Sequence, residues 1–233
     1  MRKEMPKLTW LGQASFRVEA GLDLLLDPYL SDSVFAAEGL ARLVPPPFLP
    51  EELAPDLVLL SHHHLDHTDP QTLERLGGTP YFAGPQSSCR LLEEIGISKK
   101  RMKPLSPGEV WQFKRLTVEA VSAKHSEDSL GFVLNIAGMR LYFTGDTLYH
   151  PALAEGRGEL DLLMVCINGK LGNMTVEDAA LLTAELKPKT VMPMHWGMFA
   201  ENTADPQEFA ELVAKKVPDV VVEIPELGAV VPI

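Results

Sequence analysis

Cysteine is scarce in this sequence, since Cys89 and Cys166 are the only two among 233 residues and no C-x-x-C spacing occurs. Without a set of regularly spaced cysteines, a disulfide framework is not expected. We expect both side chains to be buried, reduced thiols, which is the usual state of cysteine in a cytoplasmic protein.

Long hydrophobic runs are also missing. No stretch approaches the roughly 20 apolar residues that cross a bilayer, so a membrane-spanning protein is not expected. The first ten residues contain Arg2, Lys3 and Lys7, but no apolar segment follows them, so they do not have the pattern of a secretory signal. Both absences favour a cytoplasmic protein without a membrane partner.

Positive charge is in short supply. Lys and Arg number 21 against 32 Asp and Glu, which gives a formal net charge of −11. This balance argues against a polyanion such as tRNA as the main partner, and the chain has no stripe of aromatic and basic residues. Nucleic acid is therefore not an expected partner.

Length and composition are those of a globular protein. With 45% hydrophobic and 23% charged residues, the chain has ample material for a hydrophobic core. The length suits one large domain or two small ones, and no repeat or low-complexity tract occurs; we expect a single domain over residues 1–233.

Short apolar or alternating runs predict strands along most of the chain, with a few helices between them. The expected strands cover residues 8–11, 14–19, 22–26, 57–60, 81–83, 110–114, 116–121, 131–136, 139–143, 161–165, 190–194 and 220–224. The expected helices cover residues 69–76, 86–95, 175–187 and 206–216.

Residues 29–55 show no sustained periodicity, and Pro45, Pro46, Pro47 and Pro50 argue against a regular helix there. So long an irregular segment is typical of a lid or a binding loop. The alternative is a loop that packs against its own domain.

The most informative stretch is residues 61–67, Ser-His-His-His-Leu-Asp-His, which follows an apolar run that predicts a buried strand. It offers three imidazoles and one carboxylate: His62, His64, Asp66 and His67. This donor set suits a borderline cation such as zinc. His63 should point away from its two neighbours in an extended segment, so we expect it to pack or form hydrogen bonds rather than bind metal.

Three further candidate ligands occupy the same kind of position as His62. His125, Asp146 and His195 each follow the end of an apolar run. Loops at one edge of a sheet commonly carry ligands and catalytic groups. The candidate set therefore grows to seven: His62, His64, Asp66, His67, His125, Asp146 and His195. Five imidazoles and two carboxylates can fill two metal positions if one carboxylate bridges them, and the role of His150 stays open.

The order H-x-H-x-D-H, a lone His, Gly145-Asp146 and a final His resembles that of the metallo-β-lactamase-fold hydrolase superfamily. The resemblance implies an α/β (α+β) fold, an αββα four-layer sandwich of two mixed β-sheets flanked by helices. It also implies a dinuclear metal site at one edge of the sheets. By the family pattern, one ion is held by His62, His64 and His125 and the other by Asp66, His67 and His195, with Asp146 as the bridge.

Four short motifs are similar to the L-ascorbate-6-phosphate lactonase-like branch of this superfamily: residues 9–12, 27–30, 167–169 and 195–199. This likeness implies a metal-dependent hydrolase that attacks a small anionic lactone or ester with a hydroxide activated by two divalent ions. Zinc is the expected metal and manganese is the alternative. Asp66 or Asp146 would act as the catalytic base, and the sequence leaves both open.

Four residues are candidates for substrate contact. Asn168 and Lys170 lie in a loop after a predicted strand, and Trp196 and Tyr29 could form a wall of the site. Each has a structural alternative, because Asn168-Gly169 is a common turn pair and Trp196 can belong to the core. A small-molecule substrate is the expected partner, and a homo-oligomer is compatible with the sequence.

Two other classes of function stay open. The fold also serves phosphodiesterases and nucleases, although the acidic balance counts against nucleic acid as a substrate. The third class is a metal-binding protein without hydrolytic activity, or one with redox activity. The flavodiiron branch of the fold usually has Glu where this chain has His64, which disfavours a redox iron site.

Overall fold

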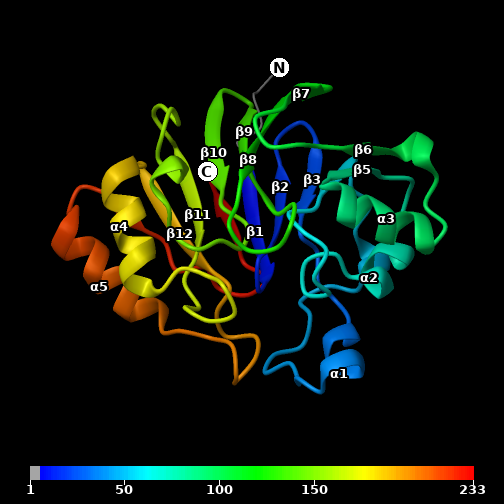
Figure 1. Ribbon diagram of the computed structural model, residues 1–233, viewed down its shortest axis with the longest axis horizontal. Helices are drawn as coiled ribbons and strands as arrows, with labels where there is room; N and C mark the ends of the chain where they lie inside the picture. Colours follow the sequence, from blue (N-terminus) through cyan, green and yellow to red (C-terminus); the bar gives the residue numbers. More distant parts are fainter. Residues whose placement is uncertain (1–5) are drawn as a thin grey trace. The chain divides into compact units, whose positions relative to one another are not determined.

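The computed structural model describes residues 6–233 and contains two seven-stranded sheets, one in each of two units of the chain (Figure 1). The first unit runs to Ser106 and takes in Glu226–Ile233, and the second spans Pro107–Pro225. Arg2 and Lys3, which entered the prediction about a secretory signal, lie outside the described residues. A single domain over residues 1–233 stays a prediction.

The sheet of the first unit has the order β14-β1-β2-β3-β4-β5-β6. Its strands are β1 (Lys7–Gly12), β2 (Ser15–Glu19), β3 (Asp23–Leu26), β4 (Leu57–Leu59), β5 (Tyr81–Gly84), β6 (Met102–Pro104) and β14 (Val230–Pro232). The same unit holds the helices α1 (Ser33–Glu38), α2 (Pro70–Arg75) and α3 (Gln86–Glu94), and 3-10 turns at Pro50–Glu52 and Lys99–Arg101.

Strand direction decides which loops of this unit share an edge. Because β2 is antiparallel to both β1 and β3, these two strands run the same way, and β4 is parallel to β3. Gln13, Asp27 and His62 therefore all follow strand ends at one edge of the first sheet.

The sheet of the second unit has the order β13-β12-β11-β10-β9-β8-β7. Its strands are β7 (Val110–Phe113), β8 (Leu116–Ser122), β9 (Leu130–Ile136), β10 (Met139–Phe143), β11 (Leu162–Cys166), β12 (Thr190–Met194) and β13 (Val221–Val222). The helices α4 (Val176–Leu186) and α5 (Pro206–Lys216) contact each other and the part of the sheet around β11 and β13 (Figure 1), and a 3-10 turn covers Pro151–Leu153.

Strand direction has the same consequence in the second unit. The antiparallel β9 lies between β8 and β10, so these two strands are parallel to each other, and β10, β11 and β12 are mutually parallel. His125, Asp146 and His195 therefore follow strand ends at one edge of the second sheet.

The central strands of both sheets are apolar along their whole length. Every residue of β4 is fully buried, and the five residues of β11 are at most 2% exposed. Unbroken apolar runs are typical of parallel strands that are covered on both faces, and each fully buried Leu or Val contributes about 1.5–3 kcal/mol. Cys89 and Cys166 are free thiols in these cores, as predicted.

The predicted fold class, two mixed sheets flanked by helices, is confirmed. The prediction that residues 29–55 contain no regular helix was wrong, because this segment contains α1 and the 3-10 turn at Pro50–Glu52. Its role as a lid or binding loop stays a prediction. Prolines restrict only their own neighbourhood, so the residues before Pro45 can form a helix. Helix α1 ends at Gly39, which takes a φ of +78° and donates its N–H to the carbonyl of Phe35 at 2.9 Å.

Two strands were missed, and one was predicted to be too long. β6 and β14 have three residues each, which is too short for an alternating pattern, and they form by pairing with β5 and β1. The strand expected over residues 220–224 contains only Val221–Val222. Among residues 6–233, no helix has the length and apolar character required to cross a membrane.

Candidate metal centre

The histidine-rich loop of the first unit is closed by a tight turn. The backbone N–H groups of His67 and Thr68 donate to the carbonyl of His64 at 3.0 and 2.8 Å. The turn lies between His64 and the adjacent pair Asp66 and His67. The ring nitrogen Nε2 of His67 lies 3.6 Å from Oδ2 of Asp66, so these neighbours do present their ligand atoms together.

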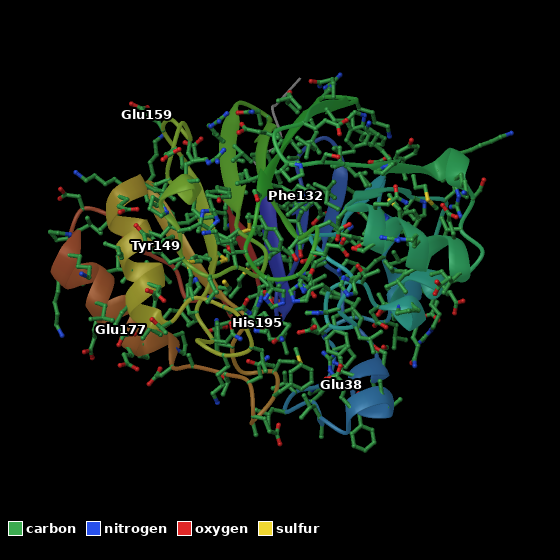
Figure 2. The ribbon with its side chains drawn as sticks, in the orientation of Figure 1. Glu38, Phe132, Tyr149, Glu159, Glu177 and His195 are labelled. Carbon is green, nitrogen blue, oxygen red and sulfur yellow. The ribbon has the colours of Figure 1, made fainter. Side chains whose placement is uncertain are left out.

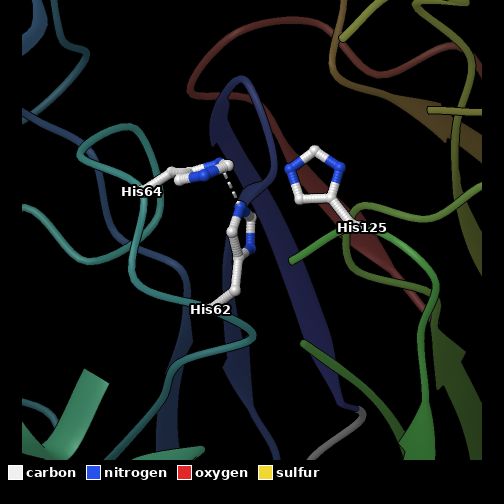
Figure 3. A group of neighbouring side chains, drawn as sticks. All are labelled: His62, His64 and His125. Carbon is white, nitrogen blue, oxygen red and sulfur yellow. Dashed lines mark hydrogen bonds between the residues drawn. The ribbon is translucent and has the colours of Figure 1, made fainter. Parts of the chain in front are cut away.

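His62 and His64 point their ring nitrogens at each other, with Nε2 of His62 3.0 Å from Nδ1 of His64 (Figure 3). The hydroxyl of Ser61 donates its single proton to Asp27, so it must accept the Nδ1–H of His62 at 2.9 Å. This leaves a lone pair on Nε2 of His62. Two nitrogens bound to one tetrahedral zinc are roughly 3.3 Å apart, so the pair is spaced as two ligands of one ion would be.

Asp27 contacts the candidate ligands but was not among the residues predicted for the site. Its carboxylate is fully buried, accepts Nδ1–H of His67 at 2.7 Å and accepts the backbone N–H of Ser61 at 2.6 Å. A carboxylate on Nδ1 fixes the tautomer in which Nε2 of His67 is free to bind metal. Burial raises the pKa of Asp27, and the hydrogen bonds from His67 and Ser61 oppose that shift.

A usable signal for Asp27 was present in the sequence. Asp27 directly follows β3, just as the predicted ligands follow their strands. Its carboxylate and the rings of His62 and His67 offer ligand atoms within 4.8 Å of one another. Gln13, which follows β1, was missed in the same way, and its Nε2 donates to Oδ2 of Asp66 at 2.8 Å.

In the second unit, two histidines approach one oxygen of Asp146. Oδ2 of Asp146 lies 3.0 Å from Nε2 of His195 and 3.8 Å from Nε2 of His125. Figure 2 labels His195, which directly follows β12. All three side chains are nearly buried, at no more than 4% exposed, so their mutual approach is shielded from solvent.

Further groups orient these side chains. Nδ1–H of His125 donates to the carbonyl of Gly172 at 3.2 Å, which leaves Nε2 as the ligand nitrogen. Nδ2 of Asn173 donates to Oδ2 of Asp146 at 2.7 Å. An aspartate that accepts from an amide and faces two imidazoles is held by direct contacts on several sides.

Three residues at these strand ends have a backbone conformation that is uncommon outside glycine. φ is +64° at His195, +52° at Gln13 and +41° at Asp27. Left-handed backbone costs about 1–3 kcal/mol at such residues and persists where the surroundings enforce it. This left-handed conformation recurs at strand ends beside the candidate ligands. The contacts that it allows these side chains to make therefore more than offset the cost of the backbone strain.

The donor sets of both units fit a divalent cation. Each contains imidazole nitrogens and at least one carboxylate, which are the ligands that zinc accepts in proteins. Hydrogen bonds at Nδ1 orient the rings of His62, His67 and His125. His63 is half-buried, and its ring contacts that of His64 at 5.0 Å between centroids. The buried His150 precedes the 3-10 turn at Pro151–Leu153, and burial, followed by the charge of Lys124, lowers its pKa.

The four predicted substrate contacts have different surroundings. Tyr29 is fully buried, and burial raises its pKa to about 12. Nε1 of Trp196 donates to the carbonyl of Pro193 at 3.1 Å, and Nζ of the exposed Lys170 donates to the carbonyl of Glu201 at 2.8 Å. The side chain of Asn168 is buried in a hydrogen-bonded network. A role in substrate binding stays a prediction for each of the four.

The model of the beta-lactamase superfamily domain matches residues 7–195, which include all seven predicted ligands. The chain belongs to this superfamily. A UPF0173 metal-dependent hydrolase of Thermococcus onnurineus is 32% identical over 91% of this chain and 94% of its own length. One of Carboxydothermus hydrogenoformans is 31% identical over 88% of this chain and 91% of its own length.

Solved structures of this superfamily have the same fold. A metallo hydrolase of Ignicoccus hospitalis superposes with a TM-score of 0.76 at 24% identity and covers 97% of both chains. A metallo-β-lactamase-fold protein of Bacillus subtilis gives a TM-score of 0.75 at 18% identity over 98% of this chain and 99% of its own. These structures share the fold, and the predicted superfamily is confirmed by the family match over residues 7–195.

Proposed function

We propose that this metal-dependent hydrolase opens a small anionic lactone or ester at a dinuclear metal centre. The proposed ligands are the seven residues predicted from the sequence: His62, His64, Asp66, His67, His125, Asp146 and His195. The family match supports this set because the matched residues, 7–195, include all seven.

One observation carries the proposal. A single oxygen of Asp146 is approached by the Nε2 atoms of His195 and His125, which come from two different strand ends of the second sheet. A carboxylate between two such imidazoles has the surroundings expected of a ligand shared by two cations.

When bound, two divalent ions, with zinc expected and manganese as the alternative, would activate a water molecule and polarise the carbonyl oxygen under attack. The side chains of the protein supply the rest. Gln13 holds Oδ2 of Asp66 at 2.8 Å, and Asn173 holds Oδ2 of Asp146 at 2.7 Å, so each carboxylate keeps a fixed orientation. Asp66 and Asp146 are the two candidates for accepting the proton of the attacking water.

The anionic substrate is proposed because of the charge of the metal ions. A small anion would meet this charge at short range, whereas the acidic surface of the chain is screened beyond roughly 8 Å. Arg42, in residues 29–55, is a structural cation. It donates to the backbone carbonyls of Tyr29, Ser31 and Val44, at 3.1–3.2 Å, and the carboxylates of Asp32 and Asp69 act on its charge.

The test measures bound metal and turnover in the same preparation. We expect close to two equivalents of zinc or manganese per chain, and hydrolysis of lactones or phosphorylated lactones from a panel that also contains phosphodiesters. If only the phosphodiesters were hydrolysed, the enzyme would be a phosphodiesterase and the proposed lactone or ester substrate would be wrong. Full activity in a metal-free preparation would overturn the proposal itself.

A matched pair of variants separates ligands from other histidines. His62→Ala should lose metal and turnover, whereas His63→Ala, at the next position in the same loop, should keep both. Equal losses in the two variants would mean that the loop, and not the ligand set, is responsible.

A further inference from the structure

Three asparagines in the loops that follow β11 and β12 form a chain of hydrogen bonds that ends on Asp146. Nδ2 of Asn173 donates to Oδ2 of Asp146 at 2.7 Å and to Oδ1 of Asn168 at 3.0 Å. Nδ2 of Asn168 donates in turn to Oδ1 of Asn202 at 2.7 Å. The three amides are between 3% and 6% exposed, so water competes little for these bonds.

The charge of Asp146 sets the direction of the whole chain. An ionised carboxylate only accepts hydrogen bonds, so Asn173 must present its NH₂ group to Asp146. Because that NH₂ group also reaches Asn168, the second asparagine must present its oxygen and turn its own NH₂ group towards Asn202. Reversing any one amide would place two acceptors or two donors face to face.

The orientation of Asn173 is kept at a cost. Both protons of its amide are used, and its Oδ1 is buried with no hydrogen-bonding partner among the described residues. A buried acceptor without a donor costs about 1–3 kcal/mol. By donating to Asp146, Asn173 therefore leaves its own Oδ1 without a hydrogen bond.

The backbone holds the loop of Asn168 and Asn173 firmly. The N–H of Gly169 donates to the carbonyl of Met174 at 2.9 Å, and the N–H of Met174 donates to the carbonyl of Thr147 at 2.9 Å. The next residue, Thr175, caps α4 through a capping box with Asp178. Asn173 is thus anchored between a helix start and the segment that carries Asp146.

We infer that Asn173, Asn168 and Asn202 form an amide relay that positions Asp146 for metal binding. The inference rests on the proposed function, in which Asp146 is the shared ligand. The relay is neutral, so it orients the carboxylate without adding charge beside the cations. Asn168, expected from the sequence to touch substrate, becomes a positioning residue that acts through Asn173.

The first experiment compares Asn173→Ala with Asn135→Ala, which removes a half-exposed asparagine of β9 that accepts a hydrogen bond only from Arg140 in the described chain. Loss of an outer-shell partner typically lowers metal affinity or activity 10–100-fold. We expect Asn173→Ala to weaken zinc binding by this factor and to lower kcat, while KM changes less than threefold. Asn135→Ala should match the wild type in zinc affinity, kcat and KM.

The second experiment tests the relay as a unit. Asn202→Ala should weaken zinc binding by a smaller factor, and the double variant Asn173→Ala/Asn202→Ala should be no worse than Asn173→Ala alone, because Asn202 acts only through Asn173. Additive losses would overturn the relay. So would an Asn173→Ala variant that keeps zinc affinity and kcat within twofold of the wild type.

A third measurement does not depend on metal or turnover. In the metal-free wild type, the side-chain NH₂ protons of Asn173 should exchange slowly with solvent in an NMR experiment, and Asp146→Ala should accelerate that exchange at least tenfold. Unchanged exchange would contradict the hydrogen bond itself. If the wild type neither binds zinc nor hydrolyses the panel, the proposed function fails, and this result is distinct from a working enzyme that tolerates Asn173→Ala.

Discussion

The two units hold their candidate ligands in different ways. In the first unit the ligands are local, since four of them lie in one loop of the chain, and they are supported by a buried carboxylate, Asp27, as well as by the amide of Gln13. In the second unit the ligands come from three separate strand ends, and neutral groups, the amide of Asn173 and the carbonyl of Gly172, support them. A local motif can thus depend on a buried charge, whereas dispersed ligands are held by amides and backbone.

The largest expected effect tests whether both units are needed. His62→Ala and His195→Ala remove one ligand from each unit, and each should lower kcat/KM more than about a hundredfold, beyond the usual effect of an outer-shell change. Steady-state kinetics and metal content per chain are the measurements. A His195→Ala enzyme that keeps its activity and its metal would show that the ligands of the first unit are sufficient for metal binding and turnover. His195 would then not be a metal ligand.

The buried charge of the first unit should dominate its stability. Asp27→Ala leaves the N–H groups of Ser61 and His67 buried without their acceptor, and removing one partner of a buried charged pair costs about 3–5 kcal/mol. Urea unfolding of the metal-free protein measures this cost. Glu211→Ala is the control, because that exposed glutamate of α5 pairs with Lys215 at the surface, and its loss should leave the free energy of unfolding close to that of the wild type. Equal losses of unfolding free energy in the two variants would mean that the buried contacts of Asp27 stabilise the protein no more than a surface ion pair does.

The carbonyl of Gly172 orients His125 in the second unit, so a substitution of Gly172 should disturb the position of that ring. A Cβ on Gly172 would come within 3.2 Å of Nδ1 of His125, and φ at Gly172 is +89°. Gly172→Ala should cost about 1–3 kcal/mol from backbone strain and should also weaken zinc binding several-fold. Gly138→Ala is a matched control, because φ is +88° there and a Cβ would meet nothing within 4 Å. The two variants should be similarly destabilised, but only Gly172→Ala should change zinc affinity.

The ligands could be predicted from the sequence because their signals are local. An imidazole or carboxylate within about three residues of the end of an apolar run needs no knowledge of distant residues, and this rule found His62, His125, Asp146 and His195. The strands beneath them were predictable for the same reason, since buried parallel strands have continuous apolar sequences. The short strands β6 and β14 were not, because they exist only through their pairing partners.

The supporting groups could not be predicted because their partners are far away in the sequence. Gln13 contacts Asp66 across 53 positions, and Asp27 contacts His67 across 40. An asparagine such as Asn168 is equally compatible with a turn, a substrate contact or a buried relay until its neighbours are known. Side-chain type identifies a ligand, whereas the role of a supporting residue is decided by tertiary packing.

The smallest expected effect concerns the two thiols, one in each unit. Burial, followed by the charge of Asp146, raises the pKa of Cys166 to about 12, so at pH 8 only roughly one thiol in ten thousand is ionised. Since the thiolate is the reactive form, raising the pH from 7 to 9 should leave Cys166 of the folded protein unreactive towards iodoacetamide. Cys89 is also buried, and both should react only on unfolding. Rapid labelling of the native protein would contradict the buried positions.

The same thiols can report on each unit separately. Mass spectrometry of labelled peptides at increasing urea concentration follows Cys89 in the first unit and Cys166 in the second. If residues 1–233 are one domain, as the sequence predicts, both thiols should become reactive in one transition, because a single domain of this kind unfolds cooperatively. Two separate midpoints would contradict that prediction. The order of the midpoints would then show whether the buried charge of the first unit or the neutral supports of the second give the more stable half.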